Sequence, residues 1–227
     1  MKRRVVVTGM GAVSPIGNTV EETWNGILNQ TCGIDEITHF DTSDYKVKLA
    51  GEVKNLDLEQ YFTKRDLKFN DRFTQFARVV SKQAIENAKL DLETMNKNRF
   101  GVIIGSGIGG VESIEKAEQS LLNRGPSKVS PYFIPMTLIN LAAGSVAIDL
   151  GAKGYVSSVV TACAAGTNAI GEAFHKIRDG YEDVMIAGGS EASITPLSVA
   201  GFASMKALHT GEDKNRASIP FDKDRSG

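Results

Sequence analysis

The sequence predicts an α/β protein with a largely parallel sheet that is covered by helices on both faces. Short apolar runs with the length of buried strands occur at 100–104, 156–161 and 184–187. Stretches with helical spacing of apolar residues separate these runs, and glycines gather where the first run ends. Strands that alternate with helices in this way usually pair in parallel between two layers of helices.

The N-terminal elements are expected to be one strand and one helix. The β-branched run Val5–Thr8 predicts a buried first strand. Thr19 and Glu22 have the spacing of a capping box, which predicts a helix starting there. Its apolar side would carry Val20, Trp24, Ile27 and Leu28. Residues 31–63 are polar and irregular, and we expect surface structure with at most a short hairpin.

Further helices are expected between and beside the predicted strands. They cover 71–89, 111–122, 138–150 and 166–178. Residues 125–135 contain three prolines around Tyr132 and Phe133. Because proline interrupts regular structure, we expect an extended loop that holds these aromatic rings.

Composition and charge limit the possible functions. A chain of 227 residues, 41% of them hydrophobic, is long enough for one globular domain, and no linker divides 1–227. A net charge of -1 provides no field that would attract nucleic acid. The two cysteines lack the spacing of a disulfide framework or a metal site and favour a reducing, cytoplasmic setting. No apolar stretch approaches the roughly 20 residues of a membrane span, so we expect a soluble protein.

Cys163 is the candidate nucleophile. It lies among small residues where an apolar strand ends and a helix begins. Unpaired N–H groups and the positive end of the helix dipole favour a thiolate there and can stabilise an oxyanion. The alternative from position alone is a buried structural cysteine.

A base for this cysteine is not evident. The candidates are His39, His175 and His209. His175 lies far along the helix that Cys163 precedes, about 18 Å away at 1.5 Å per residue. His39 and His209 lie in polar loop sequence, where solvated side chains are expected.

The glycine-rich segment 105–110 allows a different interpretation. Its GxGxxG pattern between a strand and a helix is typical of dinucleotide binding, so an NAD(P)-dependent oxidoreductase is an alternative. No acidic residue ends a second strand about 20 residues later, where a ribose would require one. A serine hydrolase is disfavoured because no GxSxG motif occurs.

Several motifs resemble those of the type II β-ketoacyl-[acyl carrier protein] synthases, the elongating condensing enzymes of bacterial fatty acid synthesis. The nucleophile motif is TACAAGTN at 161–168. Other stretches agree in order and spacing: VVTGMG at 6–11, SPIGN at 14–18, GSGIGG at 105–110, GGSEA at 188–192 and PFD at 220–222. The resemblance extends over the whole chain.

The resemblance implies a thiolase-like fold with αβαβα layers, built from two similar halves of which 1–227 is the first. It also implies that an acyl chain is transferred from acyl carrier protein to Cys163 and extended by decarboxylated malonyl, without a cofactor or metal. The histidines and lysine that act on malonyl in the family would lie beyond Gly227. The alternative is that the chain alone is a folding unit or dimer half that accepts an acyl group without condensing it.

Further site residues follow from the resemblance alone. It implies that Ile108 and Phe202 line the acyl pocket, that Ala162 lies beside the thioester, and that Phe133 closes the pocket of the partner subunit in a homodimer. Ordinary core packing is the alternative for each of these apolar residues. The residues implied to bind the acidic carrier protein are Lys64, Arg65, Lys68, Arg124, Lys128 and Lys206. Phe69 stands where relatives often have a basic residue, which would weaken this contact.

Overall fold

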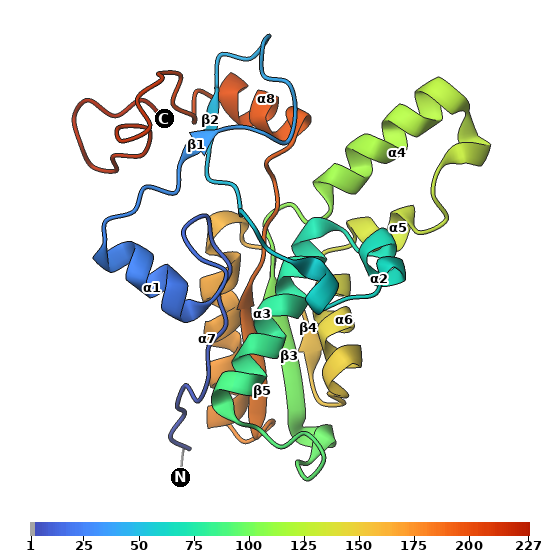
Figure 1. Cartoon of the computed structure of the whole chain (residues 1–227). Helices are drawn as coiled ribbons and strands as arrows, with labels where there is room; N and C mark the ends of the chain where they lie inside the picture. Colours follow the sequence, from blue (N-terminus) through green and yellow to red (C-terminus); the bar gives the residue numbers. More distant parts are fainter. Residues whose placement is uncertain (1–2) are drawn as a thin grey trace. The chain divides into compact units, whose positions relative to one another are not determined.

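The computed structural model describes residues 3–227, which form two compact units (Figure 1). The first unit comprises the residues up to Gly11 together with Leu58–Ala192, and the second comprises Ala12–Asp57 and Ser193–Gly227. The sequence pattern did not indicate this division.

A three-stranded parallel sheet forms the centre of the first unit. Its strands are β3 (Phe100–Gly105), β4 (Val156–Ser157) and β5 (Val184–Gly189), in the order β4-β3-β5. The predicted parallel sheet is therefore confirmed. β4 is shorter than the predicted strand 156–161, because only Val156 and Ser157 pair with β3.

Helices cover both faces of this sheet, as predicted. The helices of the first unit are α2 (Lys64–Phe69), α3 (Arg72–Ala88), α4 (Val111–Arg124), α5 (Phe133–Thr137), α6 (Asn140–Leu150) and α7 (Ala165–Arg178). Short 3₁₀ turns are η1 (Leu58–Gln60), η2 (Lys97–Arg99), η3 (Pro126–Lys128) and η4 (Ala162–Ala164). On one face, Val102 and Ile104 of β3 share a core with residues of α3 and α6. On the other face, Ile103 packs against Ala169 and Ala173 of α7.

The second unit has a small core of its own. Its elements are α1 (Val20–Leu28), β1 (Asp35–Glu36), β2 (Leu49–Ala50) and α8 (Pro196–Ser204). β1 and β2 pair antiparallel, which confirms the hairpin expected within 31–63, whereas the expectation that this segment is surface structure was wrong for the buried Ile37 and Val47. Thr19 caps α1 as predicted, whereas the Glu22 carboxylate accepts from the N–H of Asn18, 2.7 Å away. Ile37, Val47 and Val199 form the core.

Two predicted elements were wrong. Val5–Thr8 forms no strand, and Val7 is 78% exposed. A β-branched run becomes a strand only where another strand supplies hydrogen-bonding partners, and none pairs with it among residues 3–227. The segment 125–135 is not extended throughout, because η3 and the start of α5 lie within it. Pro135 is tolerated in the first turn of α5, where its missing N–H would have no helical partner.

No helix within residues 3–227 combines the length and the apolar character that crossing a membrane requires.

An exposed ion-pair cluster joins the start of β5 to the segment before β3. The Asp183 carboxylate accepts from Arg99 Nε at 2.6 Å and from Arg3 Nη1 at 2.6 Å. Hydrogen bonds from Arg99 and Arg3 lower the pKa of Asp183 from 3.8 to about 2. A lowered folded-state pKa contributes stability above pH 3.8, and this contribution is lost as the pH falls towards about 2.

We therefore expect the stability difference between the parent chain and Asp183→Asn to shrink as the solution is acidified through this pH window. Urea unfolding at several pH values between 6 and 2 would measure the difference. A difference that stays constant over the whole range would contradict the assignment.

Candidate active site

Cys163 lies in the tight turn that precedes a helix, as the sequence predicts. It is the central residue of η4, and α7 starts at Ala165. The side chain is exposed and carries a free thiol. The N–H groups of Ala164 and Ala165 already donate to the carbonyls of Thr161 and Ala162. An oxyanion donor from this turn must therefore be a different N–H group.

Ala162, next to the nucleophile candidate, has a left-handed backbone conformation. Its φ is 49°, a region that costs a residue with a Cβ about 1–2 kcal/mol. Backbone strain of this kind is held in place by the surrounding structure and gathers at functional sites. The sequence carried no signal for it, because alanine has no preference for this region.

The glycine-rich loop after β3 lies against the Cys163 turn. A Cβ on Gly105 would be 2.4 Å from the carbonyl oxygen of Ala165, so only glycine allows α7 to begin this close to β3. A Cβ on Gly107 would be 3.5 Å from the carbonyl of Ala162. At the other end of the loop, a Cβ on Gly110 would be 2.1 Å from the carbonyl oxygen of Met136 in α5. The loop is thus packed between η4 and α5.

The donors of this loop are occupied by a carboxylate of the chain itself. Glu191 accepts from the N–H groups of Gly107 at 2.6 Å and Ile108 at 3.2 Å, and from Ser106 Oγ at 3.1 Å. Ser106 Oγ in turn accepts from the N–H of Gly109 at 3.1 Å. In dinucleotide-binding proteins such N–H groups face the pyrophosphate. The structure therefore argues against the NAD(P)-dependent alternative.

The helix that follows the loop is also anchored. The buried Asp71 caps α3 and accepts from both the N–H and the hydroxyl of Ser113 in α4, at 3.1 and 2.6 Å. Burial raises the pKa of the Asp71 carboxyl, and the hydrogen bonds from Ser113 oppose this effect. α4 is thereby fixed to α3 directly after the loop.

The apolar residues implied to form the acyl pocket divide between the two units. Ile108 is 38% exposed and lies in the loop beside the Cys163 turn. Phe133, half-buried, begins α5, which packs against the other end of the same loop. Ala162, Ile108 and α5 therefore belong to one region of the first unit. Phe202 is in α8 of the second unit and is 37% exposed, and its place in the pocket stays a prediction.

The contacts described for the three histidines are with residues other than Cys163, so none of the three is identified as its base. His175 lies in the last turn of α7, far along the helix as expected, and its exposed ring packs edge-on against Phe174. His39 is exposed in the second unit, 3.8 Å from the Glu52 carboxylate. His209 is half-buried, less exposed than expected, and its Nδ1 lies 2.6 Å from Ser226 Oγ.

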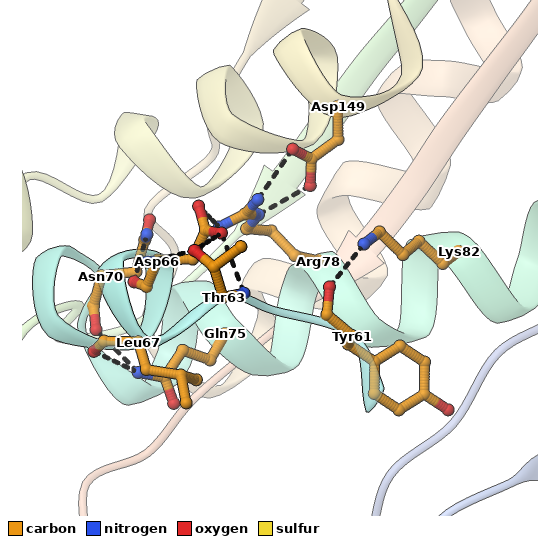
Figure 2. A network of polar contacts seen from close by, with 9 residues as sticks. All are labelled: Tyr61, Thr63, Asp66, Leu67, Asn70, Gln75, Arg78, Lys82 and Asp149. Atoms are coloured by element: carbon orange, nitrogen blue, oxygen red, sulfur yellow. Dashed lines mark hydrogen bonds and ion pairs between the residues drawn. The ribbon is translucent and has the colours of Figure 1, made fainter. Parts of the chain in front are cut away.

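The basic residues of α2 belong to a helix that a network of polar contacts fastens to α3 and α6 (Figure 2). Lys64, Arg65 and Lys68 are exposed. On the same short helix, Asp66 forms a capping box with Thr63. Hydrogen bonds from Thr63 hold the pKa of the Asp66 carboxyl below its ordinary value. The carboxylate thus remains available for Arg78, whose Nη1 is 3.5 Å away.

Arg78 connects this helix to the sheet-covering helices. Its Nε and Nη2 donate to the two oxygens of Asp149 in α6 at 2.6 and 2.8 Å (Figure 2). Its guanidinium also lies 4.6 Å from the ring centre of Phe62. Such a two-pronged pair fixes orientation as well as distance. Arg78 thus holds α2 and α6 to α3.

Phe69, at the end of α2, packs on another aromatic ring. Its ring centre is 3.8 Å from that of Tyr132, next to α5. Arg65 and Lys68 lie over the ring of Phe69 at 5.8 and 5.7 Å. Phe69, at a position that is often basic in the family that the sequence resembles, therefore connects α2 to the segment before α5.

The remaining basic residues lie on two different units. Arg124 ends α4 and Lys128 ends η3 in the first unit, and both are exposed. Lys206 is exposed in the second unit after α8. That all six basic residues form one docking face stays a prediction.

Fold and site together define a thiolase-like α/β protein with a cysteine at the start of a helix and a glycine-rich loop against it. The chain belongs to the β-ketoacyl synthase family, because residues 2–227 match the model of the family's N-terminal domain. The chain is 51% identical over 227 residues to 3-oxoacyl-[acyl-carrier-protein] synthase 2 of Synechocystis sp., covering 100% of this chain and 55% of that relative. It is 50% identical over 225 residues to the enzyme of the same name from Staphylococcus aureus, covering 99% and 54%.

Solved ketosynthase structures share the fold over the whole chain. The ishigamide ketosynthase/chain length factor matches with a TM-score of 0.90 at 28% identity, covering 100% of this chain and 55% of that one. A type II PKS acyl-carrier protein in complex with its ketosynthase matches with a TM-score of 0.87 at 33% identity, covering 100% and 55%. The chain thus spans about half the length of the relatives it matches.

Proposed function

We propose that the protein to which this chain belongs is a 3-oxoacyl-[acyl carrier protein] synthase of the elongating type, an acyltransferase of fatty acid biosynthesis. The observation that carries the proposal is the exposed Cys163 in the turn before α7, with the glycine-rich loop packed beside it. The 51% identity to an enzyme of that name supports the same reaction.

In the first step the Cys163 thiolate attacks the carbonyl carbon of an acyl thioester carried by acyl carrier protein. The new carbon–sulfur bond forms as the carrier thiolate leaves and takes up a proton. The N–H of Cys163 is the candidate oxyanion donor in this turn, because those of Ala164 and Ala165 are already bonded. The covalent intermediate divides one difficult reaction into two easier ones.

In the second step malonyl-[acyl carrier protein] loses carbon dioxide, and the resulting carbanion attacks the Cys163 thioester. A carbon–carbon bond forms, the carbon–sulfur bond breaks, and the Cys163 thiolate is released. The residues that act on malonyl are proposed to lie in the part of the protein beyond Gly227. The chain by itself is then expected to accept an acyl group without completing condensation.

Product formation by the full-length protein tests this function. Incubation with acyl- and malonyl-[acyl carrier protein] is expected to yield a 3-oxoacyl product longer by two carbons, with release of carbon dioxide. Residues 1–227 alone should show acylation of Cys163 and no such product. An acyl hydrolysis product, or no reaction of the full-length protein with either thioester, would contradict the proposal.

Acyl carrier protein is the proposed macromolecular partner, and Lys64, Arg65 and Lys68 are its proposed docking residues on α2. They are exposed on a helix whose orientation Asp66 and Arg78 maintain. Charge complementarity to an acidic partner mainly raises association rate and salt dependence. A homodimer is proposed for the full-length protein from the family resemblance. A cytoplasmic location is proposed because both cysteines are free thiols, as is usual in a reducing compartment.

Reversal of charge on α2 is expected to weaken carrier binding. Arg65→Glu combined with Lys68→Glu should raise the Kd for acyl carrier protein about tenfold at low salt, and less at high salt. Surface plasmon resonance at two salt concentrations would measure both values. Lys153→Glu, which reverses one charge where the double variant reverses two, is the control for an exposed lysine outside the proposed docking face. Equal Kd values for the double variant and this control would contradict the assignment.

A further inference from the structure

Glu191 is a polar residue that neither the nucleophile nor the proposed carrier contact explains. It follows β5, and its neighbour Ser190 pins this segment to the rest of the unit. The Ser190 N–H donates to the carbonyl of Gly105 at 3.0 Å, and its hydroxyl donates to the carbonyl of Phe73 at 2.6 Å. The Glu191 side chain is therefore projected from a fixed backbone towards the loop after β3.

We propose that Glu191 is a positioning residue that fixes the Gly107–Ile108 segment against the Cys163 turn and so sets the position of the acyl-pocket wall. This inference rests on the proposed function. Two N–H groups and one hydroxyl converge on its carboxylate at 2.6, 3.2 and 3.1 Å. Hydrogen bonds to a carboxylate are roughly twice as strong as those between neutral groups, so these three contacts hold the loop more firmly than three neutral hydrogen bonds would.

The loop needs such an anchor because its own residues provide little stiffness. Three of the four residues between Ser106 and Val111 are glycines, whose backbone loses the most conformational freedom on ordering. Glu191 holds Gly107 and Ile108 directly and holds Gly109 through Ser106. The one remaining side chain, that of Ile108, then projects from a fixed backbone.

The anchor also affects the nucleophile turn. A Cβ on Gly107 would be 3.5 Å from the carbonyl of Ala162, so the loop passes close beside this turn. Ala162 holds a strained φ of 49° immediately before Cys163. A loop released from Glu191 would withdraw this packing from Ala162 and free the Ile108 side chain at the same time. The acyl donor would then meet a less ordered wall and a less ordered turn.

Two substitutions in the full-length protein separate geometry from charge. Glu191→Gln keeps an oxygen acceptor for the two N–H groups and can donate to Ser106 Oγ, so it should retain most of the acyl loading rate. Glu191→Ala removes all three acceptor contacts and should slow loading of Cys163 about tenfold. It should also flatten the preference among acyl donors of different chain length, which a loss of stability alone would not do. Glu118→Ala on the exposed side of α4 is the control and should match the parent.

Chemical rescue provides a readout that does not depend on the proposed function. Glu191→Ala leaves a carboxylate-sized site lined by the N–H groups of Gly107 and Ile108 and the Ser106 hydroxyl. Acetate is expected to raise the Tm of this variant by binding the folded state, and to leave the parent Tm unchanged. In loading assays, acetate should restore both the rate and the chain-length preference.

The outcomes are decisive in each case. Parent-like loading and chain-length preference in Glu191→Ala would overturn the proposal, as would a variant whose Tm and loading do not respond to acetate. If Glu191→Ala does not fold, Ser106→Ala removes the link to Gly109 and should shift the chain-length preference, and an unchanged preference would overturn the proposal. A Tm response to acetate without any acylation in the parent would retain the anchor and refute the proposed function.

Discussion

Replacement of Cys163 by alanine is expected to abolish acylation of the protein by an acyl thioester, with a loss of at least about 10³-fold in rate. The reason is that the Cys163 thiolate is the group that attacks the thioester carbonyl in the proposed mechanism, and alanine has no nucleophilic side chain to replace it. Mass spectrometry of the intact protein after incubation with an acyl donor would measure the added acyl group.

Cys32→Ala is the matched control for this experiment. Cys32 is also exposed and free, but it lies in the second unit, where its Sγ is 3.6 Å from the carbonyl of Lys214. The proposed mechanism gives Cys32 no role, because the helix α7 and the glycine-rich loop that it uses belong to the site of Cys163. We expect Cys32→Ala to be acylated as fully as the parent. Equal acylation of the two variants would remove Cys163 from the proposed mechanism.

Replacement of Arg78 by alanine is expected to lower the free energy of unfolding by about 3 kcal/mol. The Arg78 side chain is only 10% exposed, and its partner Asp149 is 18% exposed. The substitution leaves the Asp149 carboxylate poorly hydrated without its partner, and it also removes the contacts to Asp66 and Phe62. Urea unfolding followed by circular dichroism would measure the change.

An exposed ion pair provides the comparison for Arg78. Lys116 pairs with Glu112 one turn earlier on α4, and its side chain is 69% exposed. Exposed pairs of this spacing contribute about 0.3–0.5 kcal/mol, so Lys116→Ala should change the free energy of unfolding by no more than this. A loss from Arg78→Ala as small as that from Lys116→Ala would show that the Arg78 network does not stabilise the unit.

Local patterns predicted most of the elements that surround the site. The helix over 71–89 and the strand over 100–104 were found because their apolar periodicity survives in the tertiary structure. α2 was missed although Thr63 and Asp66 provide a capping box, because six residues are too few for a periodic signal. Val5–Thr8 was assigned to a strand for its β-branched residues, and strand formation depends on a neighbour that residues 3–227 do not provide.

The sequence by itself determined the α/β class, the family and the position of Cys163 before a helix, because these depend on periodicity and on short motifs. Only the tertiary structure decided that Glu191 occupies the donors of the glycine-rich loop, 83 to 85 positions away along the chain. It also revealed the left-handed Ala162 and the joining of α2 to α6 through Arg78. Such contacts join residues that are distant in the chain. Which residues meet depends on how β3, β5 and the helices pack, and a local sequence pattern does not contain that information.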